Sequence, residues 1–238
     1  MKLHRFFGDF YFTSPTIIIS DITLVNQIKN VLRLKEGASI ILCDNKNNET
    51  IANIIKIHGK SIECEITKVV KNINEPNRHI VLYCSLLKRE NFELVIQKAT
   101  EIGVKEIVPL LCERTIKLSL KKERLKKIAR EAAEQSGRGI IPQFHEIQNC
   151  SDALMSAQSN SKNIIFEPLS PLFKPIDIDD NARIGIFIGP EGGWSDSELS
   201  LAYSLAESQK NYFISSLGKL TLRAETAAIV ASFLLIYN

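Results

Sequence analysis

The sequence predicts an α/β protein with two domains, a small β-rich one followed by a larger one in which helices cover a mostly parallel sheet. Three observations predict it. The first third of the chain contains short runs of β-branched residues, a polar segment with a proline follows at residues 71–78, and apolar strands then alternate with helical patterns. We therefore assign residues 1–72 to the first domain and residues 73–238 to the second.

The first domain is expected to contain one helix and several strands. The helix runs over residues 23–37 and closes at Gly37, and the strands cover residues 39–44, 51–57 and 61–70. In the last strand Ile62, Cys64 and Ile66 alternate with polar residues, which indicates a strand with one face in water. Strands with one short helix favour a small barrel.

The second domain alternates strands and helices, which predicts a parallel sheet covered by helices. Strands are expected at residues 79–87, 106–112, 163–169, 183–190 and 211–215. Helices are expected at residues 89–103, 121–137, 195–210 and 225–237, and Gly103 stops the first of them.

Composition and cysteine usage narrow the class of protein. The 238 residues carry a net charge of +3, with 45% hydrophobic and 24% charged residues, which is ordinary for a soluble globular protein. None of the five cysteines belongs to a CxxC pair, so we expect free thiols in a reducing compartment and no metal site. The start lacks the apolar stretch of a secretory signal, and the longest apolar run is too short to span a bilayer. We expect a cytoplasmic protein with no membrane partner.

The segment "IFIGPEGGWSDSEL", residues 186–199, reads as a strand, a glycine-rich turn and a helix. Ser195 and Glu198 match the capping box that starts a helix. Neither GxxxxGK[ST] nor GxGxxG occurs in the chain, and Glu191 would repel a phosphate by roughly 4 kcal/mol at about 4 Å. The loop therefore fits a ligand that is neutral or positive beside Glu191. A tight turn without a ligand is the alternative.

A second polar turn follows the next predicted strand, in "SLGKLTLRAETAAIVASFLL", residues 216–235. Arg223, Glu225 and Thr226 cluster at the start of an apolar helix, where a carboxylate and a hydroxyl commonly serve only as caps. Because ligands bind at the carboxyl ends of parallel strands, both turns could line one pocket.

Further segments occur in a fixed order along the chain: "HRFF" at 4–7, "VLRLKEG" at 31–37, "QKATEIGVKEIVPLLCERT" at 97–115 and "IAREAAEQSGRGIIP" at 128–142. Together with the two polar turns, they resemble the RsmE family of small-subunit ribosomal RNA uridine-N3 methyltransferases, in the SPOUT superfamily. The resemblance runs the length of the chain.

The resemblance implies an N-terminal PUA-like β-barrel for RNA and a C-terminal SPOUT α/β domain with a parallel sheet and a C-terminal trefoil knot. It also implies a homodimer and S-adenosylmethionine as cofactor. This cofactor carries a sulfonium and an ammonium but no phosphate, which agrees with the charge of Glu191. The implied cofactor-binding residues are Glu167, Gly189, Pro190, Glu191, Gly192, Gly193, Leu217, Gly218, Leu222, Arg223, Glu225 and Thr226.

The chain departs from the family pattern in the second turn. The family usually has Leu-Gly-Pro-Arg, two residues, and Arg-Thr-Glu-Thr, whereas here Lys219-Leu220 stands in place of Pro-Arg and Ala224 in place of the first Thr. The backbone pocket is expected to survive. An arginine contact at position 220 does not carry over, and Lys219 is the candidate to supply the charge.

Basic residues cluster from Arg114 to Arg138, where nine Lys or Arg stand against three acids. Such a face is usually just solvated, but beside a methyltransferase pocket it favours contact with RNA phosphates. The expected partner is small-subunit ribosomal RNA or the assembled small ribosomal subunit. The candidate RNA-binding residues are Arg5, Arg89, Arg114, Lys117, Arg138 and Lys219.

The implied chemistry is attack of uracil N3 on the methyl group of the sulfonium. Neutral uridine keeps a proton on N3, so a base must accept it or a donor must stabilise the anion. Glu225 is the candidate base or orienting group, and Arg223 or Arg5 is the candidate donor. Two alternatives stay open: a non-catalytic RNA-binding ribosome-assembly factor, and a SPOUT methyltransferase that acts on a different RNA.

Overall fold

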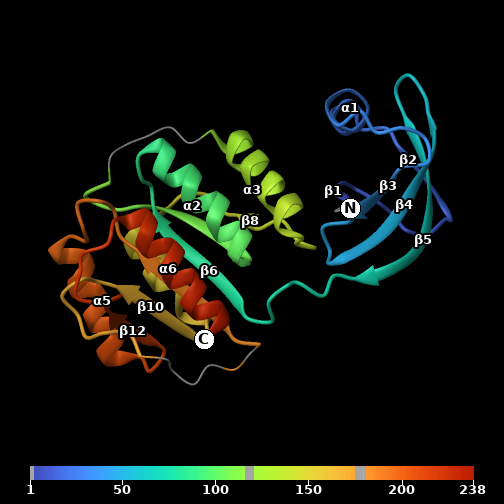
Figure 1. Ribbon diagram of the computed structural model, residues 1–238. Helices are drawn as coiled ribbons and strands as arrows, with labels where there is room; N and C mark the ends of the chain where they lie inside the picture. Colours follow the sequence, from blue (N-terminus) through green and yellow to red (C-terminus); the bar gives the residue numbers. More distant parts are fainter. Residues whose placement is uncertain (1–2, 116–120, 175–178, 180) are drawn as a thin grey trace. The chain divides into compact units, whose positions relative to one another are not determined.

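The chain divides into two compact units. The structure is a computed structural model that describes residues 3–115, 121–174, 179 and 181–238. The N-terminal unit comprises Met1–Glu75 and Ala133–Ile141, and the C-terminal unit comprises Pro76–Ala132 and Pro142–Asn238 (Figure 1). Within the described residues, no helix combines the length and apolar character that crossing a membrane requires.

The N-terminal unit is built on a five-stranded sheet with the order β1-β3-β4-β5-β2. β1 pairs with β3 in parallel, and the other neighbours are antiparallel. The β-rich first domain is thereby confirmed. Its strands are β1 (His4–Phe7), β2 (Thr16–Ile19), β3 (Ser39–Cys43), β4 (Asn48–Ile57) and β5 (Ile62–Lys71).

The core of this sheet follows the period-two pattern of its strands. Ile62, Cys64 and Ile66 are buried on one face of β5, as the sequence predicted. The single predicted helix is shorter than expected. α1 (Ile22–Asn26) continues as a π-helical turn over Gln27–Val31, and Arg33 then takes a left-handed φ of 53° that a helix cannot continue. The prediction of a helix up to Gly37 is therefore wrong in its last turn and a half.

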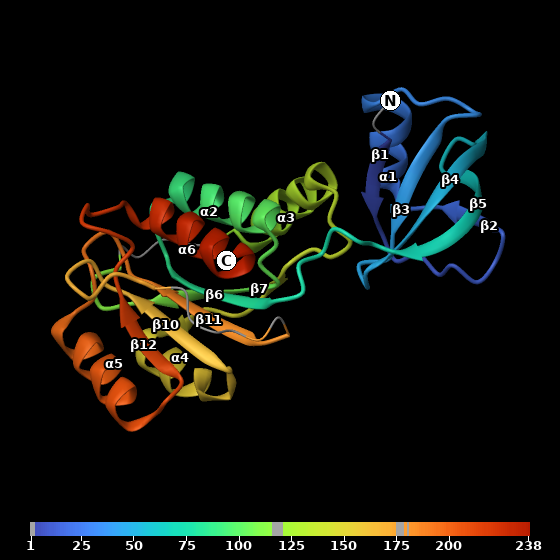
Figure 2. The ribbon, with the colours of Figure 1, turned by 60° about the horizontal axis from the view of Figure 1, so that its bottom comes forward.

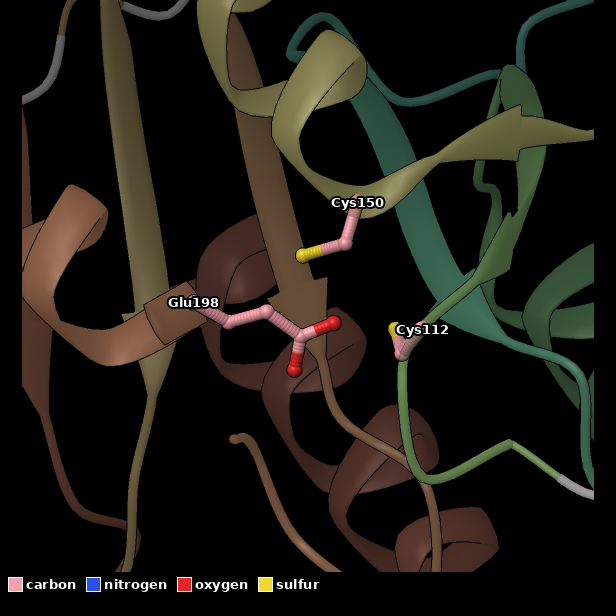
Figure 3. A group of neighbouring side chains, drawn as sticks. All are labelled: Cys112, Cys150 and Glu198. Atoms are coloured by element: carbon pink, nitrogen blue, oxygen red, sulfur yellow. The ribbon is translucent and has the colours of Figure 1, made fainter. Parts of the chain in front are cut away.

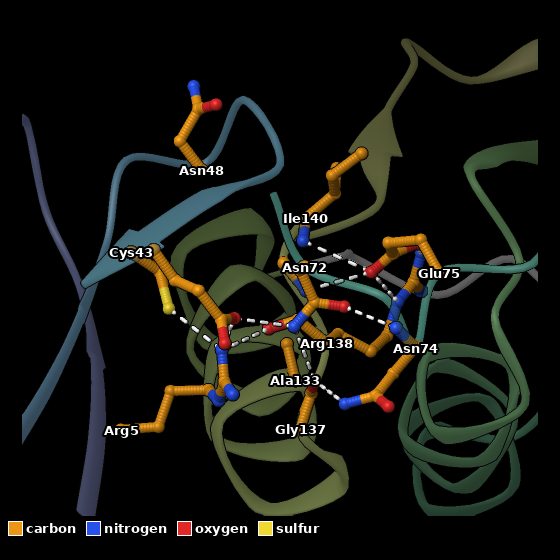
Figure 4. A network of polar contacts seen from close by, with 12 residues as sticks. Arg5, Cys43, Asn48, Asn72, Asn74, Glu75, Ala133, Gly137, Arg138 and Ile140 are labelled. Atoms are coloured by element: carbon orange, nitrogen blue, oxygen red, sulfur yellow. Dashed lines mark hydrogen bonds and ion pairs between the residues drawn. The ribbon is translucent and has the colours of Figure 1, made fainter. Parts of the chain in front are cut away.

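The segment Ala133–Ile141 is tied to the N-terminal unit by a buried polar network (Figure 4). Arg138 pairs with Glu75 at 2.9 Å, and the same carboxylate accepts the backbone N–H of Gly139 at 2.9 Å. Asn72 donates from its side-chain amide to the carbonyl oxygen of Gly137 at 3.0 Å. Arg5 pairs with Glu49 at 2.5 Å and donates to the carbonyl oxygen of Arg138 at 3.2 Å. These contacts hold a segment from the middle of the chain against the first sheet.

The C-terminal unit contains a seven-stranded sheet with the order β12-β10-β11-β6-β7-β8, in which β9 also pairs with β7. Every pairing in it is parallel, which confirms the predicted α/β domain. Its strands are β6 (His79–Ser85), β7 (Glu106–Leu111), β8 (Gln143–Phe144), β9 (Gln148–Asn149), β10 (Lys162–Phe166), β11 (Arg183–Ile188) and β12 (Tyr212–Ser215).

Helices cover both faces of this sheet. α2 (Arg89–Ile102) packs with α6 (Ala224–Tyr237) on one face, and α4 (Cys150–Ser156) and α5 (Asp196–Ser208) lie on the other (Figure 2). α3 (Lys122–Ser136) begins in the C-terminal unit and ends in the N-terminal one. A sheet covered on both faces has apolar central strands, and β6 is buried along nearly its whole length.

The amino-terminal edge of the sheet carries a charged network around Glu106. The two terminal guanidinium nitrogens of Arg183 donate to the two oxygens of this carboxylate, Nη1 to Oε1 and Nη2 to Oε2, the latter at 2.9 Å. His79 and His145 contact the two carboxylate oxygens at 2.5 and 2.7 Å. Burial of Glu106 raises the pKa of its carboxyl, but hydrogen bonds from Arg183, His79 and His145 outweigh burial and hold the pKa at about 2. Glu106 is therefore ionised at neutral pH.

Candidate cofactor pocket

A cleft of about 980 Å³ opens at the carboxyl-terminal edge of the parallel sheet. Parallel strands bring their carboxyl ends to one edge, so the loops that follow β10, β11 and β12 meet there. Residues after β6 and β7 add to its wall. The lining residues are Lys88, Asn91, Arg114, Phe166, Glu167, Pro168, Leu169, Ile188, Gly189, Pro190, Glu191, Gly193, Trp194, Asp196, Leu199, Leu217, Gly218, Leu220, Thr221, Leu222, Arg223, Ala224, Glu225 and Ala227.

The glycine loop, residues Gly189–Trp194, connects β11 to α5. A side chain on Gly189 would place its Cβ only 2.9 Å from the Trp194 ring. The indole N–H of Trp194 donates to the carbonyl oxygen of Phe166 at 3.0 Å, so the ring is fixed between two pocket loops. Gly193 has a φ of +72°, a conformation that favours glycine. Two of the glycines are thus required by the backbone and by Trp194.

The helix after this loop starts as the sequence predicted. Ser195 is the N-cap of α5, its side chain accepts the backbone N–H of Glu198, and the Glu198 carboxylate accepts the backbone N–H of Ser195. The predicted capping box is therefore confirmed. It fixes the point at which the glycine loop ends.

Four carboxylate residues line the cleft, namely Glu167, Glu191, Asp196 and Glu225. Glu191 is exposed, and one of its oxygens accepts the backbone N–H of Lys88 at 3.2 Å. Glu225, in the first turn of α6, is only 7% exposed. Among the residues that the structure describes, its Oε2 atom is buried and has no hydrogen-bond partner. A buried carboxylate oxygen is costly without a donor or a cation, so the cleft suits a ligand that brings one.

Arg223 is the N-cap residue of α6, immediately before Glu225. Its side chain is exposed and makes no capping hydrogen bond to the helix. The guanidinium is therefore available at the wall of the cleft, close in sequence to the buried carboxylate.

Most of the predicted cofactor residues line this one cleft. Two do not: Gly192 is an exposed residue of the glycine loop that faces Arg114, and Thr226 is an exposed residue of α6. The ten that line it are Glu167, Gly189, Pro190, Glu191, Gly193, Leu217, Gly218, Leu222, Arg223 and Glu225. The structure adds an apolar part of the wall that sequence reasoning missed, above all Phe166, Ile188 and Leu199. Their only signal was a position at the end of a strand or at the start of a helix.

The predicted RNA-binding residues are dispersed. Arg114 lines the cleft and Lys219 is exposed beside it, whereas Arg89 pairs with Glu93 at 3.0 Å. Lys117 lies outside the described residues. Arg5, also a candidate catalytic donor, and Arg138 belong to the N-terminal unit, where their side chains are 8% and 4% exposed in ion pairs with carboxylates. Their assignment to RNA stays a prediction.

Cys112, Cys150 and Glu198 form a cluster whose sulfur and carboxylate atoms lie within 4.8 Å of one another (Figure 3). Both oxygens of Glu198 already accept a backbone N–H, one from Ser195 and one from Glu113. A hydrogen bond between the two thiols lowers the pKa of Cys112 and raises that of Cys150. We therefore assign Glu198 to capping and the two thiols to the core, and the absence of a metal site stays a prediction. All five cysteines are buried free thiols.

Two regions of the chain match known domain families. Residues 74–236 match the RNA methyltransferase domain, and residues 26–67 match the RNA methyltransferase PUA domain. The parallel sheet, the cleft at its carboxyl edge and the small β-rich unit agree with both matches. They define the class: an RNA methyltransferase domain with an attached PUA domain.

Individual relatives narrow the class further. The ribosomal RNA small subunit methyltransferase E of Mesomycoplasma hyopneumoniae is 35% identical over 219 residues, which cover 89% of this chain and 90% of the relative. The protein of that name from Buchnera aphidicola is 33% identical over 91% of this chain and 90% of its own. The chain belongs to this family, the small-subunit methyltransferases E.

A solved structure agrees with the family assignment. The crystal structure of the Neisseria gonorrhoeae ribosomal RNA small subunit methyltransferase E superposes with a TM-score of 0.86 and 30% identity, and the match covers 97% of this chain and 95% of that one. That protein was solved bound to S-adenosyl methionine.

Proposed function

We propose that this chain transfers a methyl group from S-adenosylmethionine to N3 of a uridine in small-subunit ribosomal RNA. The observation that carries the proposal is the buried Glu225 oxygen without a hydrogen-bond partner among the described residues, on the wall of a cleft at the carboxyl edge of the sheet. The family relatives supply the class of reaction, because they are small-subunit ribosomal RNA methyltransferases by name.

The residues of the cleft fit this cofactor. S-adenosylmethionine supplies a methyl group made electrophilic by its sulfonium, and it carries two positive charges and no phosphate. Glu191 and Glu225 are two of the four carboxylate residues that line the cleft, and a carboxylate favours a cation beside it. Phe166, Ile188 and Trp194 add apolar surface for a purine ring. We assign the cofactor to the predicted residues that line the cleft, with the backbone of the glycine loop shaping one wall.

The reaction requires a proton acceptor and a stabiliser of negative charge. Transfer forms a bond between N3 and the methyl carbon, breaks the bond between that carbon and sulfur, and releases the N3 proton. We assign the proton to Glu225, whose Oε2 has lone pairs to accept it. We assign the negative charge that develops on the uracil to Arg223, whose guanidinium is exposed on the same wall.

The proposed partner is small-subunit ribosomal RNA, free or in the assembled subunit, which implies activity in the cytoplasm. We further propose a trefoil knot formed by the segments around the glycine loop and residues 217–223. We also propose that residues 1–72 bind RNA and that residues 73–238 carry out catalysis.

We propose a homodimer as well. Phe233 and Tyr237 of α6 support it, because they are 52% and 56% exposed and their rings lie 5.1 Å apart. Sedimentation equilibrium tests the homodimer, because it measures the mass of the protein in solution, which should be twice the mass of one chain.

Methyl transfer from labelled S-adenosylmethionine to small subunits that lack the modification tests the function. We expect label in the ribosomal RNA, and mass spectrometry of its nucleosides should identify 3-methyluridine. RNA binding without transfer would indicate an assembly factor instead. Label at another nucleobase position, or only in another RNA, would contradict the proposed specificity.

A further inference from the structure

The turn Cys112–Thr115, which follows β7, is joined to the glycine loop and to the start of α5. The backbone N–H of Glu113 donates to Glu198 at 2.9 Å, and the Ser197 hydroxyl donates to the Glu113 carboxylate at 3.1 Å. Arg114 donates from one guanidinium nitrogen to the carbonyl oxygens of Trp194 at 2.8 Å and Gly192 at 3.3 Å. The turn therefore contacts the second half of the glycine loop and the first turn of α5.

The turn itself is anchored to the sheet. The Thr115 hydroxyl oxygen accepts the backbone N–H of Cys112 at 2.9 Å, and the Thr115 N–H donates to the Cys112 carbonyl oxygen at 3.1 Å. The same hydroxyl lies 2.8 Å from the hydroxyl of Ser85, the fully buried last residue of β6. Arg114 thus projects from a fixed base.

Within the glycine loop, one turn hydrogen bond joins the backbone N–H of Gly193 to the carbonyl oxygen of Pro190 at 2.9 Å, and the carbonyl oxygens of Gly192 and Trp194 are held by Arg114. Gly193 adopts a φ of +72°, and glycine samples many other conformations at low cost. Gly192 has no contact with the cleft, yet a Cβ at this position would lie 3.3 Å from Cβ of Arg114. The absence of a side chain at Gly192 therefore allows Arg114 to approach the loop backbone.

We propose that Arg114 is a positioning residue, which holds the glycine loop in the conformation that binds the cofactor. This inference rests on the proposed function of the cleft. The sequence assigned Arg114 to RNA, and its side chain is 48% exposed. Its partners favour the loop instead, because one terminal nitrogen donates to two loop carbonyl oxygens and the other lies 3.7 Å from the carboxylate of Asp196 at the start of α5.

Without Arg114, a smaller fraction of the molecules should hold the glycine loop in the conformation that binds the cofactor. If only a fraction of the molecules hold the binding conformation, the apparent affinity for the ligand falls by that fraction. The hydrogen bonds that Arg114 makes are charge-assisted, so we expect affinity for S-adenosylmethionine to fall roughly tenfold when they are removed.

Isothermal titration of the full chain with S-adenosylmethionine, without RNA, tests the inference. Arg114→Met keeps the length of the side chain and removes the donors, and Arg114→Lys keeps a charge that can reach one carbonyl. Arg124→Met is the matched control, because Arg124 is a similarly exposed arginine that pairs with Glu93 outside the cleft. We expect roughly tenfold weaker binding for Arg114→Met, an intermediate value for Arg114→Lys and no change for Arg124→Met.

A second measurement separates the loop from the RNA. In the methyl-transfer assay, Arg114→Met should raise KM for the cofactor and leave affinity for the ribosomal RNA unchanged. Unchanged cofactor affinity in Arg114→Met and Arg114→Lys, with weakened RNA binding, would overturn the inference in favour of an RNA contact. A wild-type chain that binds no S-adenosylmethionine would instead contradict the proposed function itself. Should Arg114→Met fail to fold, Arg114→Lys decides alone.

Discussion

Glu225 combines two properties that seldom occur together in a side chain without a functional role. It is buried, and one of its oxygens has no hydrogen-bond partner in the described part of the chain. We expect Glu225→Gln to lose methyl transfer at saturating cofactor by about a hundredfold or more, because an amide cannot accept the N3 proton, and to bind S-adenosylmethionine more weakly, because the wall loses one negative charge. Single-turnover transfer to ribosomal RNA and calorimetry measure the two quantities.

Glu207→Gln is the control for this prediction, since Glu207 is an exposed residue of α5 outside the cleft. It should leave both quantities unchanged. Full turnover by Glu225→Gln would remove the role of Glu225 as the base. A loss of cofactor affinity without any loss of the transfer step would make Glu225 a cofactor ligand only.

The role of a single residue could be predicted from the sequence where the residue belongs to a local motif. It could not be predicted where the role depends on a partner that only the tertiary structure brings close. Glu191 and Glu225 lie in polar turns after strands, which is a local signal. The ion pairs of Arg5 and Arg138 had no such signal, because Glu49 and Glu75 lie 44 and 63 residues from their partners along the chain. An arginine with a distant carboxylate partner looks in the sequence like one that is free for RNA.

Among the elements, the glycine loop requires a residue without a side chain at position 189, and this requirement can be tested. A Cβ there would meet the Trp194 ring at 2.9 Å, and the ring cannot retreat easily because its N–H is bonded to Phe166. We expect Gly189→Ala to lower the free energy of unfolding by about 1–3 kcal/mol and to weaken S-adenosylmethionine binding. Urea denaturation and calorimetry measure both effects.

Gly59→Ala is the matched control for Gly189→Ala. Gly59 is exposed, and nothing lies within 4 Å of the position that its Cβ would take. Its stability and cofactor affinity should equal those of the wild type. Equal stability of Gly189→Ala and the wild type would mean that Trp194 can move, and the ring would then be no fixed part of the wall.

Long elements with strong periodicity were predictable, and short ones were not. The sequence identified α2 with its end at Gly103, which takes a φ of 115°, and the start of α5 at its capping box. It missed β1 and β2 as strands, the two-residue strands β8 and β9, and α4. Such short segments carry too few residues to show a period, and in the strands among them pairing with a neighbouring strand decides the conformation.

At the scale of the whole molecule, the Glu106 network makes stability depend on pH. The pKa of the Glu106 carboxyl falls from 4.5 to about 2 in the folded chain. The folded state therefore holds this proton less tightly than the unfolded state, so the stabilisation is complete above about pH 4.5 and is lost as the pH falls towards about 2. Urea unfolding at pH 7 and pH 3 should show lower stability at pH 3.

Glu106→Gln isolates the contribution of this one group. Glu106→Gln leaves Arg183, which is 37% exposed, without its carboxylate, so we expect a loss of about 1–2 kcal/mol at pH 7 and a smaller fall between pH 7 and pH 3 than in the wild type. Glu123→Gln, at an exposed position of α3, should keep the wild-type pH dependence. An unchanged pH dependence in Glu106→Gln would assign the effect to other carboxyls.

The order of strands was beyond sequence reasoning, although the class of each sheet was not. Alternating strands and helices predicted a parallel sheet, but nothing local places β12 beside β10 and β6 between β11 and β7. Nor does any pattern place Ala133–Ile141 in the N-terminal unit, because the periodicity of α3 runs through the boundary without a break.

Because Ala133–Ile141 packs with the first sheet, the chain cannot be divided into its two units in a simple way. No single cut separates the two units, because the N-terminal one is made of two stretches with Pro76–Ala132 of the other unit between them. A fragment that ends near residue 72 would lack Glu75 and every partner on Gly137–Ile141, and its complement would keep the Arg138–Glu75 pair but lose the donors Arg5 and Asn72. The N-terminal unit therefore cannot be replaced by recombination at a single junction. Such a replacement would combine a foreign first sheet with the original Ala133–Ile141 segment, which would not match it.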